Sequence, residues 1–307
     1  MGEALHDGGD GSVRAVARLA EPFHAITYYS RELTNLTDHG YKGWWHGYFG
    51  YRPAPLGEVS ASTVSSIFYN FAPRMVARAV PGVWAIRSPA DTTAWRLELV
   101  GRALSRIFGD GASGGDITTA ANLVRRALDN AESGARPLFA AYAELEWPDD
   151  DALALWHGCT LLRELRGDSH NVALAAAEVD GPMSHVLMAG RGHGNRPTIL
   201  AIRGWTDQEW DSAVERLMAR GWVDADGSLT TEGNEARSAI ERHTDGLSAG
   251  PVTRLGPDRL QRFCSAMDPL VEFLKESGEV SGRWPPPHLL KAAPSTQGRS
   301  TDQGSNS

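Results

Sequence analysis

The sequence is poor in the features that mark secreted, membrane-spanning or metal-binding proteins. Only two cysteines, Cys159 and Cys264, occur among 307 residues, and both lie in apolar helical contexts. This usage favours buried thiols in a reducing compartment over a disulfide framework or a zinc site. No apolar run approaches the ~20 residues of a membrane span, and the motifs His-Glu-x-x-His and Cys-x-x-Cys are absent. We therefore expect a cytoplasmic protein with no membrane partner, no metal and no other cofactor.

Positive charge is also scarce, since 30 Lys and Arg face 38 Asp and Glu and the net charge is −8. Neutralisation of phosphates supplies much of the affinity for nucleic acids, so this balance argues against a broad nucleic-acid footprint. The net charge does not exclude a basic face on one part of the surface. The length allows two domains, each with a core of its own.

The spacing of apolar residues is predominantly helical, and we predict a mainly α fold. The expected helices are 13–32, 63–80, 90–108, 118–131, 137–145, 150–166, 170–179, 182–188, 198–203 and 257–275. A glycine-rich break at 109–115 is the expected domain boundary. The predicted division is a disordered N-terminus at 1–12, helical domains at 13–110 and 116–280, and a disordered tail at 281–307.

Residues 198–245 predict a winged-helix unit, in which a two-stranded wing and a further helix follow a helix. Thr206 is the expected N-cap of one helix, and Gly221 is its expected end. Residues 222–230 are typical of a short hairpin, and a further helix begins at Thr231. The expected apolar stripe of the first helix is formed by Trp210, Val214, Leu217 and Met218.

The charge of this unit is unusual for a DNA-binding protein. In a DNA reader the helix beginning near Thr206 would lie in the major groove and supply basic side chains to phosphates. Here that helix has two arginines, and the wing adds two aspartates and no base. We therefore expect weak DNA binding. The acidic residues of the helix are Asp207, Glu209, Asp211 and Glu215.

An aromatic segment at 40–57 holds five glycines and is expected to form a loop. Flat rings and close backbone approach at glycines can build the wall of a ligand pocket, and the alternative is a plug that packs in the core. For His24 the alternative is a buried histidine whose hydrogen bonds are satisfied. The predicted ligand-binding residues are His24, Tyr28, Trp44, Trp45, His46, Tyr48 and Phe49.

The segment 155–170 holds the densest group of polar residues in an otherwise apolar helix. Gly167 is the expected end of that helix, and the next one begins near His170. In one interpretation the four polar residues converge on a pocket and perform acid–base chemistry. In the other they form a tight helix–helix corner. The predicted catalytic residues are His157, Glu164, Asp168 and His170.

Several segments together resemble an actinobacterial, MarR-like helix-turn-helix family from about residue 13 to residue 275. The family segment Arg-Gly-Asp-Gly-His has Ser169 at its fourth position here. The resemblance implies a helix-turn-helix fold and a cytoplasmic setting. Unlike MarR regulators, the chain has no basic wing and no Ser/Thr/Arg-rich recognition helix. The segments that carry the resemblance are 21–25, 43–49, 68–73, 155–170 and 204–221.

Two functions from different classes fit these observations. The first is a small-molecule-binding winged-helix protein, a ligand-responsive regulator that binds DNA weakly as a homodimer. The second is an enzyme of specialised metabolism that keeps the scaffold and performs proton transfers on a mostly apolar substrate. The acidic helix favours the enzyme and the family resemblance favours the regulator. The regulator is the function expected first.

Overall fold

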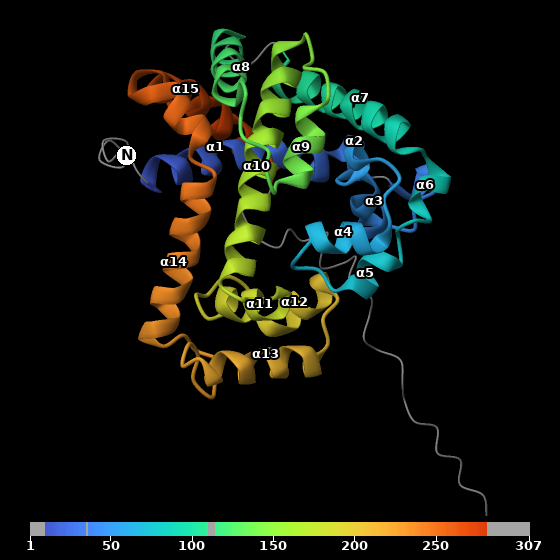
Figure 1. Cartoon of the computed structure of the whole chain (residues 1–307). Helices are drawn as coiled ribbons and strands as arrows, with labels where there is room; N and C mark the ends of the chain where they lie inside the picture. Colours follow the sequence, from blue (N-terminus) through green and yellow to red (C-terminus); the bar gives the residue numbers. More distant parts are fainter. Residues whose placement is uncertain (1–9, 35, 110–113, 281–307) are drawn as a thin grey trace, which may run out of the picture.

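The computed structural model describes residues 10–34, 36–109 and 114–280, and within these ranges it contains helices and no β-strand (Figure 1). The mainly α prediction is therefore confirmed. In chain order the helices are α1 (Asp10–Tyr29), α2 (Arg31–Thr34), η2 (Leu36–His39), α3 (Trp44–Tyr51), η3 (Ala54–Leu56), α4 (Ala61–Ile67), α5 (Pro73–Ala77), α6 (Val83–Ile86), α7 (Pro89–Phe108), α8 (Gly114–Leu128), α9 (Pro137–Ala143), α10 (Asp151–Ala176), α11 (Gly181–Ala189), α12 (Arg196–Arg203), α13 (Asp207–Ala219), α14 (Thr231–Leu247) and α15 (Gly250–Glu276).

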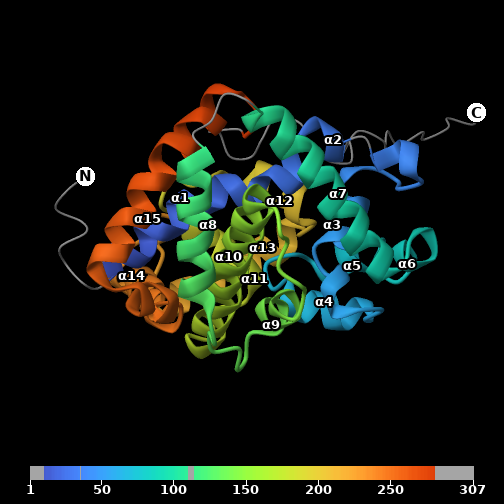
Figure 2. The same ribbon diagram turned by 90° about the horizontal axis from the view of Figure 1, so that it is seen from above.

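Helix α10 is the centre of the fold. Asp150 caps its first turn by accepting a hydrogen bond from the Leu153 amide at 2.9 Å, and no proline interrupts the helix. Seen from above, α8 and α15 lie on one side of α10 and α7 on the other (Figure 2). Below this body, α11, α12 and α13 form a smaller unit that α10 and α14 join to the body (Figure 1).

The hydrophobic cores divide the chain differently from the predicted domains. The larger core combines residues before the expected boundary, such as Phe108, with residues after it, such as Ile117 and Leu270. The break at 109–115 is therefore not a division between cores, because α8 packs against α10 and α15 within the same body. The smaller core belongs to the lower unit and includes Leu174 of α10 and Ile240 of α14.

The helix-turn-helix of the lower unit follows the local sequence signals closely. Gly204 takes a left-handed conformation at the end of α12, and Thr206 and Glu209 form a reciprocal capping box at the start of α13. Trp210 and Leu217 are buried in the smaller core. Met218 does not belong to this stripe, because its side chain faces solvent.

The predicted two-stranded wing is wrong, because the described residues between α13 and α14 contain no β-strand. Between α13 and α14 the described residues form one isolated antiparallel bridge, between Val223 and Leu229. The Asp224 amide donates to the Ser228 carbonyl at 3.0 Å, and the turn that ends at Gly227 takes up the residues between them. Too few residues flank the turn for two strands to pair beyond this single bridge.

Other segments also differ from the prediction. The expected aromatic loop at 40–57 contains the helix α3. Gly47 lets this helix pack closely against Leu36, because a Cβ at Gly47 would lie 2.3 Å from the Leu36 side chain. The expected helix 63–80 is split into α4 and α5 at 68–72. Residues 10–12 are helical, whereas 1–9 and 281–307, also predicted to be disordered, lie outside the described residues.

Candidate ligand-binding site

Helix α10 carries the four predicted catalytic residues, and it does not end at Gly167. Asp168 caps another helix, because its carboxylate accepts hydrogen bonds from the Leu138 and Phe139 amides of α9, each at 2.9 Å. The thirteen residue steps from His157 to His170 therefore span about 20 Å of continuous helix. The prediction that these two histidines converge on one pocket is wrong.

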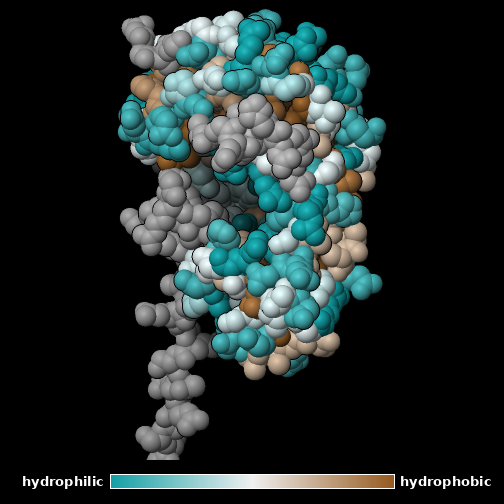
Figure 3. Space-filling view, turned by 90° about the vertical axis from the view of Figure 1, so that its left-hand side faces the viewer, coloured by the Kyte–Doolittle hydropathy of each residue, from teal (hydrophilic) through white to brown (hydrophobic). Residues whose placement is uncertain are grey.

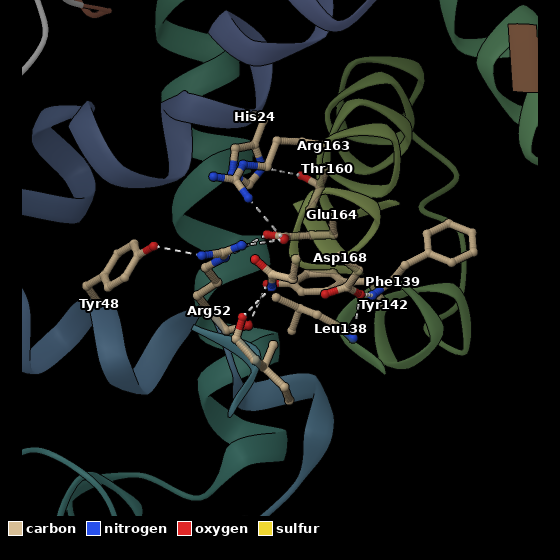
Figure 4. A network of polar contacts seen from close by, with 12 residues as sticks. His24, Tyr48, Arg52, Leu138, Phe139, Tyr142, Thr160, Arg163, Glu164 and Asp168 are labelled. Carbon is tan, nitrogen blue, oxygen red and sulfur yellow. Dashed lines mark hydrogen bonds and ion pairs between the residues drawn. The ribbon is translucent and has the colours of Figure 1, made fainter. Parts of the chain in front are cut away.

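A buried ion pair between Arg52 and Glu164 forms the heart of a polar network between α10 and the segment that follows α3 (Figure 4). The Arg52 guanidinium donates to both carboxylate oxygens of Glu164, from Nε at 2.9 Å and from Nη2 at 2.7 Å. Its Nη1 donates to the Tyr48 hydroxyl at 2.9 Å. Arg163 adds a further contact to Glu164, at 3.3 Å. Two arginines thus share one carboxylate that is fully buried.

The ionisation of Glu164 follows from these contacts. Burial alone would raise the pKa of Glu164, but the charges of Arg52 and Arg163 and the hydrogen bond from Arg52 outweigh it and hold that pKa at about 2. The carboxylate is therefore ionised throughout the physiological range. It positions Arg52, and a role as a proton carrier at neutral pH does not fit this pKa.

His24 extends the network towards α1. Its Nδ1 lies 3.2 Å from the Thr160 hydroxyl, and its ring contacts Tyr28 with centroids 5.1 Å apart. Burial, reinforced by the charge of Arg163, lowers the pKa of His24 well below its usual value. Within the described ranges, His24 Nε2 and the Tyr28 hydroxyl are buried and have no hydrogen-bond partner. Each of these two predicted ligand residues therefore has one buried polar atom whose hydrogen bonding is unsatisfied within the described residues.

The remaining predicted ligand residues belong to α3, and all of them except His46 pack against one another in one aromatic cluster. Trp44 stacks on Tyr48 with centroids 5.2 Å apart, and Trp45 meets Phe71 edge to face. Phe49 is buried in the larger core. His46 lies apart from the network and accepts a hydrogen bond from the Lys42 amide at 3.3 Å. Tyr48 is the member of this group that contacts the polar network directly.

A hollow of about 250 Å³ lies beside the network, between α1, α10 and α14, and we call it the α14 hollow. Gly167 is part of its lining, and a Cβ there would lie 2.9 Å from the Arg163 guanidinium. Seen from the side of α14 and α15, the surface is recessed between the body and the lower unit, with hydrophilic residues around the recess (Figure 3). The polar side chains of the hollow are Glu21, Arg163, Arg166, His170 and Glu241.

Ion pairs across this hollow connect α10 to α14. Arg166 donates to Glu241 at 2.9 Å and to the fully buried side chain of Asp245 at 2.5 Å. His170 Nδ1 lies 3.0 Å from the Thr244 hydroxyl. Burial lowers the pKa of His170 to about 4, although the charge of Glu241 opposes this effect. His170 is thus neutral at physiological pH.

His157 occupies a different pocket near the upper end of α10. Its ring meets Trp147 edge to face with centroids 4.9 Å apart. Burial, followed by the charge of Arg96, lowers the pKa of His157 to about 4. The four predicted catalytic residues therefore divide among three places, because Glu164 and Asp168 lie in the network, His170 lines the α14 hollow and His157 lines this pocket.

Arg52 is the main member of the network that sequence reasoning missed. It is the only arginine or lysine between Lys42 and Arg74, and it lies within the aromatic segment. A lone basic residue among aromatic rings is a usable signal, because burial of its charge requires an acidic partner. The partner, Glu164, lies 112 residues away in the chain.

The exposed surroundings of α13 are acidic and internally paired. Residues 180–235 contain nine Asp and Glu against five arginines and no lysine. Arg196 lies between Asp207 and Asp211, at 2.8 and 2.6 Å, and Arg216 contacts Asp180 at 2.5 Å. Phosphate groups would compete with these carboxylates for the arginines.

Comparison with known proteins identifies the family. Residues 13–281 match the model of a helix-turn-helix family, and the chain belongs to that family. Searches of curated proteins and of solved structures found no match. None of the helices in the described ranges is both long and apolar enough to cross a membrane.

Proposed function

We propose that this helix-turn-helix protein is a ligand-responsive regulator, in which a small anionic molecule binds in the α14 hollow and shifts the lower unit. The observation that carries the proposal is the position of Arg166 and its acidic partners, Glu241 and Asp245, between α10 and α14. An anion in the hollow would compete with these carboxylates for the guanidinium groups of Arg163 and Arg166. Binding would thereby alter the contact between the two helices.

The connection of α10 and α14 to the lower unit supports the regulatory part of the proposal. Leu174 of α10 and Ile240 of α14 both pack in the smaller core, beside Trp210 of α13. A change in the spacing of α10 and α14 at the hollow would therefore tilt α13. A ligand shifts such an equilibrium only as far as its affinities for the two arrangements differ.

Weak DNA binding is part of the same proposal. Residues 198–245 act as a helix-turn-helix unit whose acidic α13 contributes little phosphate contact, and a homodimer would present two copies of it. We expect fluorescence anisotropy with a nonspecific duplex at ~0.15 M salt to give a Kd no tighter than ~10 μM. A Kd in the nanomolar range with a steep salt dependence would contradict this expectation.

Native mass spectrometry of the protein purified from its own host tests whether a small molecule binds in the α14 hollow. The wild-type protein should retain a small molecule, and Arg166→Met should lose it because a cation that binds the anion is removed. Arg18→Met is the matched control, because Arg18 is exposed on α1 and does not line the hollow. Hydrogen exchange of α14 should be faster in Arg166→Met than in Arg18→Met. Protein without an adduct, together with unchanged exchange of α14 in Arg166→Met, would refute the proposal.

The enzyme hypothesis has less support from the geometry. Glu164 is held as an ion by Arg52, and Asp168 is engaged by two backbone amides of α9. His157 and His170 face different pockets. No observation in the described residues brings a proton donor and a proton acceptor together around a substrate.

A further inference from the structure

A second pocket, of about 510 Å³, lies between η3, α7 and the upper part of α10, and we call it the α7 pocket. At about 100° per residue, His157 lies on roughly the opposite side of α10 from Arg163 and Arg166. The walls of the pocket are largely small and apolar, with Ala54, Pro55, Ala90 and Ala94 among them. A pocket of a few hundred Å³ with apolar walls and few polar groups is typical of small-molecule sites.

Three buried polar atoms belong to residues that line this pocket. Arg96 Nε, Trp156 Nε1 and His157 Nε2 have no hydrogen-bond partner within the part of the chain that the structure describes. The three residues are only 2%, 2% and 3% exposed. Buried polar groups in native proteins are nearly always satisfied, so each such atom requires an explanation. The first two are hydrogen-bond donors only, and the third can donate.

Arg96 is also a buried cation without a carboxylate. Its Nη1 donates to the Tyr51 carbonyl at 3.3 Å and to the Tyr142 hydroxyl. Its guanidinium lies over the rings of Tyr142 and Trp156, 4.9 and 5.2 Å from their centroids. Among the described residues, no Asp or Glu forms an ion pair with it, whereas the similarly buried Arg52 has Glu164. Buried charges are normally paired, so the missing component is an anion.

We propose that the α7 pocket binds a small monocarboxylate with an apolar body. The carboxylate accepts hydrogen bonds from Arg96, Trp156 and His157, and the apolar body lies against the alanines and prolines of η3 and α7. Glu146 lines the pocket with an exposed side chain, and its charge disfavours a dianion such as phosphate. The site is separate from the α14 hollow and does not depend on the function proposed for it.

Calorimetric titration with two carboxylates, octanoate and 2-naphthoate, tests this proposal against uncharged 1-octanol. Octanoate should bind at least about tenfold more tightly than 1-octanol, because its carboxylate gains charge-assisted hydrogen bonds to a buried cation. Arg96→Met should weaken octanoate binding by about tenfold or more and leave 1-octanol binding unchanged. Ala90→Phe places a ring at the pocket wall and should weaken both ligands.

Ala90 is exposed, so Ala90→Phe is expected to fold even if Arg96→Met does not. Arg18→Met is the control for a change of charge outside the pocket, and circular dichroism confirms folding of every variant. Three outcomes would overturn the proposal. The first is no binding of either carboxylate at ~5 mM, the second is equal affinity for octanoate and 1-octanol, and the third is octanoate binding that Ala90→Phe does not weaken.

Discussion

Two buried arginines beside α10, Arg52 and Arg96, form polar clusters that differ in whether their charge is balanced. Arg52 meets Glu164 through two hydrogen bonds, and Tyr48 accepts a third. Arg96 is just as buried and has no carboxylate partner in the described residues. A cluster whose charges are balanced from within the chain can serve the fold alone. A cluster with an unpaired buried charge indicates a ligand. Whether each buried charge has a partner in the chain therefore distinguishes a structural cluster from a ligand-binding one better than the residue types do.

The largest expected effect is the loss of stability on breaking the complete cluster. Arg52→Met leaves Glu164 as a buried, poorly compensated carboxylate, so we expect the free energy of unfolding to fall by about 3–5 kcal/mol. Urea denaturation at pH 7 measures this change. Glu98→Ala is the control, because Glu98 and Arg102 form an exposed pair with side chains 56% and 65% exposed. That variant should change stability by no more than about 0.5 kcal/mol, and equal losses in the two variants would remove the distinction between the clusters.

Local signals predicted the parts of the fold that local interactions determine. The capping box of Thr206 and Glu209 and the burial of Trp210 follow from residues close together in the chain. The wrong helix end at Gly167 shows the limit of such signals. A glycine followed by a capping aspartate normally ends a helix, but Asp168 is engaged by amides of α9, 29 and 30 residues earlier in the chain. Contacts of this kind have no signature in a single sequence.

The candidate site was predicted less completely than the fold for the same reason. Glu164 and Tyr48 were identified from the sequence and share the network, but Arg52, which joins them, was not. Periodicity places residues on a face of one helix, and it does not say which other helix covers that face. The separation of His157 from His170 depended on one helix being continuous, which the glycine signal concealed.

A smaller effect should appear in the pH dependence of stability, at Asp168, which follows Glu164 by four residues on α10. Burial raises the pKa of Asp168 to about 6, although its hydrogen bonds from the amides of Phe139 and Leu138 lower it. A carboxyl group with a raised pKa in the folded state stabilises the fold below its unfolded pKa of about 3.9, and this stabilisation is lost as pH rises through about 6. We expect a loss of about 2–3 kcal/mol between pH ~4 and pH ~7 from this group.

Denaturation of wild type and Asp168→Asn across this pH range measures the contribution. The variant cannot titrate at this position, so the decline of stability between pH ~4 and pH ~6 should become shallower. Glu164 contributes the opposite slope at lower pH. Its depressed pKa of about 2 adds stability that is lost as pH falls below about 4. Identical pH profiles for wild type and Asp168→Asn would show that Asp168 ionises normally.

The smallest expected effect completes the comparison with the same substitution at Arg96, the arginine that lacks a carboxylate partner. Arg96→Met removes the hydrogen bonds to the Tyr51 carbonyl and the Tyr142 hydroxyl, but it also removes a buried cation that has no carboxylate partner among the described residues. The two contributions oppose each other, so we expect a loss of no more than about 1–2 kcal/mol. Octanoate should raise the melting temperature of wild type and not of Arg96→Met, because a ligand stabilises only the form that binds it. A loss as large as that of Arg52→Met, with no effect of octanoate on either protein, would mean that Arg96 serves the fold alone.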